Sequence, residues 1–255
     1  MTAWQNQPII RVRKGRYLFT FFINISAGVG GKCSMEGKRL TSYAMEELEC
    51  PKCGHKHSLK KYKVINVTEK AKLKEEIMKN RLYQFSCEEC EYMAPITYDS
   101  LYVDSQRNIM IYMAPVMNAE IKAEIAELEQ EKGIDKRLVD NINDLKEKIM
   151  IADNHLDDRV IEIIKIMYID QMKKEMEDDT LLNILFDYNR DNYCFLVFFQ
   201  KKGIGKIPLT REFYRQVEDK YKDAIKEHSM DSFMKIWNGQ ERFFLKTTIN
   251  LIKNN

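Results

Sequence analysis

Histidine and tryptophan are scarce in this chain of 255 residues, which contains four histidines and two tryptophans. None of the histidines lies in a motif with a known catalytic mechanism, and no serine occurs in a G-x-S-x-G sequence. The sequence "GIG" at 203–205 lacks the remaining glycines of a dinucleotide-binding loop. We therefore expect that the protein is not an enzyme. An uninterrupted stretch of about 20 apolar residues is also missing, so we expect no transmembrane helix.

Charge is nearly balanced, with 41 Lys or Arg residues against 39 Asp or Glu residues. The balance is uneven along the chain, because residues 1–44 hold seven basic side chains and a single acidic one. The remaining body is mildly acidic, which disfavours nucleic-acid binding, since phosphate contacts need a cationic surface. The apolar content of 44% is typical of a globular protein rather than a disordered one.

Residues 1–44 form an N-terminal extension with three possible origins. "RVRKGRYLFTFFINISAG" resembles a secretory signal, but Asn24 interrupts its apolar part and no convincing cleavage site follows. Gly30-Gly31 permits a ribosome-binding sequence upstream of Met35, and Met45 is a second candidate start. Residues 1–34 are therefore either leader sequence read as protein, a true extension, or a signal peptide.

Four of the six cysteines form two C-x2-C pairs, "CPKC" and "CEEC", separated by 33 residues. A spacing of two residues lets both thiolates of a pair reach one ion at about 2.3 Å, and two such pairs are typical of a zinc ribbon. Pro51 restricts the first turn, and Gly54 can adopt the left-handed conformation. The sequence therefore predicts one structural Zn²⁺ bound by Cys50, Cys53, Cys87 and Cys90. A redox dithiol and a disulfide pair remain alternatives.

The other histidines and cysteines near these motifs or elsewhere in the chain are not expected to bind the metal. His55 and His57 follow the first pair and, with four thiolates available, are expected beside the metal or at the surface rather than bound to it. Cys194 lies in the apolar run "NYCFLVFF", where a buried, inert thiol is expected. Cys33 lies in the extension and is expected to stand apart from the site.

The segments "MEELECPKCGHKHSLKKYKVINVT", "LYQFSCEECEYMAPITYDSLYVDSQRNIMIYMAP" and "NDLKEKIMIADNHLDDRVIEIIK" resemble the CpXC domain proteins of bacteria and archaea. The resemblance extends over roughly 45–225 and implies no activity, because the family has none assigned. Cys50-Pro51-Lys52-Cys53 matches the motif of the family name. The second motif departs from it, because Glu88 stands where proline is expected and Glu91 follows Cys90.

Hydrophobic periodicity predicts an α+β fold: a zinc-ribbon-like β module with an inserted helix, a helical segment, then C-terminal strands plus helices. Four parts are expected: the extension at 1–44, the module at 45–117, the helical segment at 118–179 and an α/β part at 180–255. A helical stripe is predicted from Leu138 through Ile149, and Thr210 is predicted to cap a later helix. "ERFFLKTTINLI" at 241–252 is expected to be a packing helix.

These patterns predict a cytoplasmic, zinc-stabilised protein that contacts another protein. The lysine-rich stretch "KCGHKHSLKKYK" makes nucleic-acid binding an alternative, opposed by Glu88, Glu89 and Glu91 on the second pair. A thiol redox role for the C-x2-C pairs is a further alternative. We expect no membrane association. The sequence does not indicate an oligomeric state or the identity of the partner.

Overall fold

The computed structural model describes residues 39–175, 179–189 and 192–226. These residues divide into two compact units, the first ending at Gln106 and the second beginning at Arg107. Both units contain helices and strands, so the mixed α+β class predicted from the sequence is confirmed. The predicted division into four parts stays a prediction. Cys33 and the helix expected at 241–252 lie outside the described residues.

Two β-ribbons and a short parallel pairing build the first unit. Strands β1 (Ser42–Glu49) and β2 (Lys56–Asn66) are antiparallel, as are β3 (Gln84–Ser86) and β4 (Met93–Pro95). Strand β5 (Ser100–Asp104) runs parallel to the far end of β2. A parallel pair needs a crossover connection. Here the crossover contains α1 (Lys72–Met78) and a 3₁₀ turn (Arg81–Tyr83), together with β3 and β4.

The first unit has its core where β2 meets β5 and α1. Ile65, Ile77 and Leu101 are almost completely buried. Towards the β1–β2 turn the ribbon leaves this core, and burial along β1 alternates between half-buried and exposed side chains. Such alternation is typical of a ribbon covered on one face only. The turn that carries Cys50 and Cys53 therefore projects from the core on a partly solvated ribbon.

The second unit begins with a β–α–β arrangement. Strands β6 (Ile109–Met113) and β7 (Asp135–Val139) are parallel, and α2 (Ala119–Leu128) connects them. Helices α3 (Ile142–Asp153) and α4 (Asp158–Glu175) follow. The chain then forms an antiparallel meander, before two short helices. The meander and these helices are β8 (Leu181–Asn189), β9 (Asn192–Phe199), β10 (Gly203–Leu209), α5 (Arg211–Lys220) and α6 (Lys222–Lys226).

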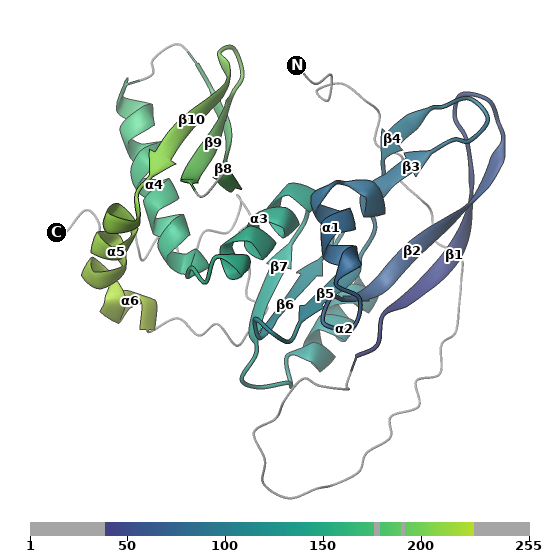
Figure 1. Cartoon of the computed structure of the whole chain (residues 1–255), viewed down its shortest axis with the longest axis horizontal. Helices are drawn as coiled ribbons and strands as arrows, with labels where there is room; N and C mark the ends of the chain where they lie inside the picture. The colour runs from purple at the N-terminus through teal and green to yellow at the C-terminus, as the bar shows by residue number, and fades with distance from the viewer. Residues whose placement is uncertain (1–38, 176–178, 190–191, 227–255) are drawn as a thin grey trace, which may run out of the picture. The chain divides into compact units, whose positions relative to one another are not determined.

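Helices α4 and α5 pack on one face of the β8–β10 sheet (Figure 1). Val160 and Ile164 of α4 and Phe186 and Phe195 of the sheet form the centre of this core. Thr210 begins α5 by accepting a hydrogen bond from the backbone N–H of Phe213, so the predicted N-cap is confirmed. No helix among the described residues is long and apolar enough to cross a lipid bilayer.

The predicted helical stripe from Leu138 to Ile149 is wrong at its start. Leu138 lies in β7, and α3 begins only at Ile142 after the capping residue Asn141. Strand β7 has the sequence DKRLV, and its last four residues are all buried. Such a short buried strand has no period-2 pattern, and Leu138 lies four residues before Ile142, which matches helical spacing by coincidence.

A buried cluster of charges connects β7, α3 and α4, and we call it the charge cluster. Its members are three cations and three anions, each 5% exposed or less: Arg137, Lys148, Lys165, Glu147, Asp158 and Glu162. Asp158 is the first residue of α4 and is nevertheless only 5% exposed. Asp158 is buried because it forms ion pairs with Arg137 (2.6 Å) and Lys148 (3.0 Å). Glu147 also accepts a hydrogen bond from the backbone N–H of Phe186 in β8.

Candidate metal centre

The first cysteine pair lies on the tight turn between β1 and β2. The backbone N–H of Cys50 donates to the carbonyl oxygen of His55 (2.8 Å), and the N–H of Gly54 donates to the carbonyl oxygen of Cys50 (2.9 Å). Gly54 has φ +72°, a left-handed conformation that glycine adopts without strain. The turn therefore has the form that the spacing and Gly54 predicted.

The second pair repeats this turn between β3 and β4. The N–H of Cys87 donates to the carbonyl oxygen of Tyr92 (2.8 Å), and the N–H of Glu91 donates to that of Cys87 (3.0 Å). Glu91 occupies the position of Gly54 and has φ +58°. The departure from the motif at Glu88 and Glu91 therefore leaves the hydrogen-bond pattern intact. It places a residue with a side chain in a conformation that favours glycine.

The two turns bring the four sulfur atoms together. Cys50 Sγ lies 3.6 Å from Cys90 Sγ, and Cys53 Sγ lies 3.6 Å from Cys87 Sγ. All four lie within 4.8 Å of one another, and all four cysteines are free thiols. Tetrahedral coordination with metal–sulfur bonds of about 2.3 Å requires sulfur atoms about 3.8 Å apart. The cluster therefore has a size that fits a metal ion, and the thiols are not paired as disulfides.

Thiol acidity differs strongly within the cluster. Burial opposes ionisation of Cys50, but hydrogen bonds from the backbone of Cys53 and Lys52 and from neighbouring thiols lower its pKa to about 6. The backbone of His55 favours the Cys53 thiolate, but desolvation and the other sulfurs raise its pKa to about 12. Desolvation also raises the pKa of Cys90. The protein groups alone therefore favour the Cys50 thiolate and oppose those of Cys53 and Cys90, and a bound divalent cation would compensate the additional negative charge.

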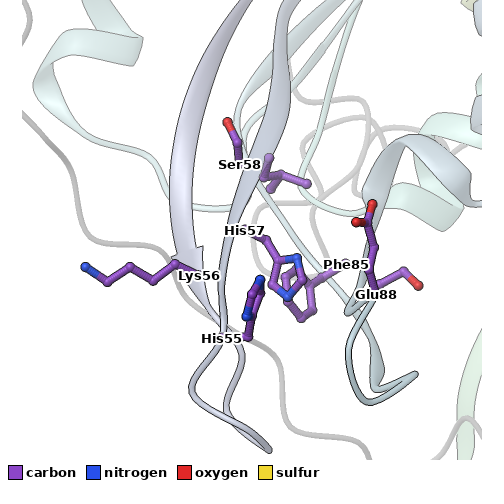
Figure 2. A pocket seen from close by; sticks show the side chains of 8 residues that line it. His55, Lys56, His57, Ser58, Phe85 and Glu88 are labelled. Carbon is purple, nitrogen blue, oxygen red and sulfur yellow. The ribbon is translucent and has the colours of Figure 1, made fainter.

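His57 contacts the cluster from β2. Its Nε2 lies 3.1 Å from Cys87 Sγ, and its ring packs edge-on against Phe85 at a centroid distance of 5.5 Å (Figure 2). His55 packs on His57 at 4.8 Å and makes no described contact with a sulfur. His57 thus lies beside the cluster, where a proton on Nε2 would be donated to the Cys87 thiolate. Such hydrogen bonds orient metal ligands and tune the affinity of a site.

A shallow pocket of about 340 Å³ adjoins the cluster. Residues 55–59 form one wall, and Phe85, Ser86 and Glu88 form the other (Figure 2). Lys56 extends from β2 on the side away from Phe85 and Glu88 (Figure 2). The pocket thus has an aromatic floor and mainly polar walls. No sequence pattern indicated this pocket, because its walls are 30 residues apart in the chain.

Comparison with known protein families agrees with this geometry. Residues 48–165 match the family model described as CpXC protein. Over this range the chain is similar to CpXC proteins. The resemblance seen in the sequence is therefore confirmed for this range, whereas its extension to residue 225 stays a prediction. The CpXC segment contains the four clustered cysteines, and all six residues of the charge cluster lie within it. No curated protein and no solved structure matches the chain.

Two further cysteines were considered in the sequence, Cys194 and Cys33. Cys33 lies outside the residues that the structure describes. Cys194 lies in β9 of the second unit, half-buried, with its Sγ 3.9 Å from Asp187 Oδ2. The two histidines were expected beside the metal or at the surface, and the structure places His57 against a sulfur and leaves His55 exposed. The alternation of side chains along a β-strand places residues 55 and 57 on one face, so it could have predicted that the two histidine rings lie together.

Proposed function

We propose that the four cysteines of the CpXC segment bind one Zn²⁺ with a structural role, and that the protein serves as an interaction module for another protein. The observation that carries the metal assignment is the convergence of four Sγ atoms within 4.8 Å of one another from two equivalent turns. Soft thiolate ligands in a tetrahedral set favour zinc, or iron in a sulfur site, over hard cations.

A structural role follows from the donor set. Four thiolates fill the coordination shell of zinc, whereas catalytic zinc usually keeps one position for water or substrate. The ion would connect the β1–β2 turn to the β3–β4 turn, which the chain otherwise joins through more than 30 residues. Free thiols fit a reducing compartment such as the cytoplasm.

Protein contact is supported by the exposed face of the β1–β2 ribbon. Tyr43 is 50% exposed and Met45 is 56% exposed, and they lie on the same face of β1. The neighbouring lysines are engaged within the chain: Lys61 pairs with Glu46, and the Lys60 ammonium lies 3.7 Å from the Tyr43 ring. These contacts favour a protein partner over nucleic acid, which would need available cations.

Metal analysis combined with unfolding tests the proposal. We expect one zinc per chain by elemental mass spectrometry, and a large loss of stability on removal by a chelator. Cys87→Ser should lose the metal and up to about 10 kcal/mol of unfolding free energy, the scale of structural zinc sites. Cys194→Ser is the matched control and should retain both. Iron in place of zinc would correct the metal, and unchanged stability in Cys87→Ser would refute the structural role.

A further inference from the structure

The pocket beside the cysteine cluster follows the edge of β2. Side chains of a strand alternate between its two faces, so a pocket lined by the consecutive residues 55–59 lies along the strand edge. Strand β1 pairs with one edge of β2 from Ser42 to Glu49. On the other edge β5 pairs only with Val64–Asn66. Within the described residues, the part of β2 that borders the pocket therefore has no strand partner on that edge.

The opposite wall is held at a fixed distance. Phe85 and Ser86 belong to β3, which pairs with β4 only in the described chain. The T-shaped contact of Phe85 with His57, and the contact of His57 with Cys87, connect this wall to β2. The sulfur cluster joins the same two ribbons at their turns. The groove is therefore formed before any ligand arrives, which reduces the entropic cost of binding.

Lys56 and Glu88 both line the groove, and the charge of the wall that carries Glu88 favours a cationic ligand. Glu88 lines the groove, and its carboxylate forms no hydrogen bond or ion pair with other described residues. Glu89 and Glu91 lie on the same exposed turn, whereas the Lys56 side chain points away from Glu88 (Figure 2). A polyanion such as nucleic acid would be repelled by this wall, and a Lys or Arg side chain would be attracted.

We propose that this groove binds an extended segment of a partner polypeptide through main-chain pairing with the open edge of β2, with a Lys or Arg side chain of the segment at Glu88. Addition of a strand to a sheet edge is an established mode of peptide recognition, in which the main chain supplies affinity and side-chain pockets supply specificity. The volume of about 340 Å³ fits a ligand-binding pocket. This inference rests on the proposed function, because the metal site holds the two walls together.

Peptide selection against the full, metal-loaded chain tests the inference. A phage-displayed library of random heptapeptides is the probe, and selected peptides are then synthesised and titrated by fluorescence anisotropy. We expect enrichment of Lys or Arg among β-branched residues. In amide NMR spectra, the largest shifts on binding should fall on residues 55–59 and 85–88.

Two charge reversals distinguish a specific contact in the groove from a general effect of net charge on peptide affinity. Glu88→Lys should weaken the selected peptides at least about tenfold. Glu127→Lys is the matched control: it makes the same change at an exposed carboxylate of α2 that has no ion pair with other described residues, and it should alter affinity less than twofold. Glu88→Gln should give an intermediate loss.

Several outcomes would overturn the inference: no enriched sequence, equal binding to Glu88→Lys, amide shifts outside the groove, or preferential binding of a single-stranded RNA probe. Zinc content and thermal unfolding are measured on the same sample. A folded, zinc-loaded chain that selects no peptide refutes the groove alone, whereas a chain without bound metal refutes the proposed function.

Discussion

Asp158→Asn is a severe test of the charge cluster, because it removes one charge without changing the size of the side chain. The Asp158 carboxylate accepts hydrogen bonds from Arg137 Nε and Nη2, each at 2.6 Å, and lies 3.0 Å from Lys148 Nζ. Burial alone would raise the pKa of Asp158, but these two cations hold it far below the usual value of 3.8. The carboxylate is therefore ionised in the folded protein at neutral pH.

The substitution leaves three buried cations, Arg137, Lys148 and Lys165, to share the two remaining anions. Breaking a buried ion pair by removing one partner costs about 3–5 kcal/mol, which is a large part of the 5–15 kcal/mol typical of a domain. We expect a loss of this size at pH 7 in urea unfolding followed by circular dichroism. The control is Asp99→Asn, which breaks the exposed pair with Lys63 (2.9 Å) and should cost less than about 1 kcal/mol.

The pH dependence gives the same test a second readout. Because the folded-state pKa of Asp158 is lowered, its stabilisation is present above about pH 4 and is lost as the pH falls below that value. The difference between wild type and Asp158→Asn should therefore be constant from pH 6 to 8 and shrink in acid. A cost below 1 kcal/mol at pH 7, or a difference that grows in acid, would refute this account of the cluster.

The remaining predictions concern the metal centre. Glu91→Gly should stabilise the protein by about 0.5–1 kcal/mol by relieving a left-handed backbone, and Gly54→Ala should destabilise it by about 1 kcal/mol, both measured by thermal unfolding. The opposite result at either position would show that the two turns are not equivalent. His57→Phe should lower zinc affinity about tenfold in competition with a chromophoric chelator, because a hydrogen bond to a cluster sulfur is lost. His55→Phe should leave affinity unchanged, and equal effects of the two substitutions would contradict the role of His57.

Sequence alone predicted the elements that depend on local spacing. The two C-x2-C pairs and Gly54 indicated the turns, and polar residues such as Thr210 marked where helices begin. These features act over a few residues, and local hydrogen bonds are sufficient to form them. The second turn was harder to predict, because Glu91 adopts a conformation that its residue type disfavours.

Long-range charge pairing could not be predicted in the same way. Arg137 and Asp158 are 21 residues apart, and each becomes compatible with burial only when the other is beside it. Patterns that assign charged residues to solvent therefore place Arg137 and Asp158 wrongly. They also miss strand β7, which contains Arg137. The groove at β2 could not be predicted for the same reason, because only the fold brings Glu88 beside residues 55–59.

Zinc K-edge X-ray absorption on the purified full chain identifies the ligands of the metal directly. We predict four sulfur scatterers at about 2.3 Å and no nitrogen or oxygen ligand. The spectrum should be unchanged in Cys194→Ser and His55→Phe. Fewer than four sulfur ligands, a histidine ligand, or a protein purified with disulfides and no metal would contradict this prediction.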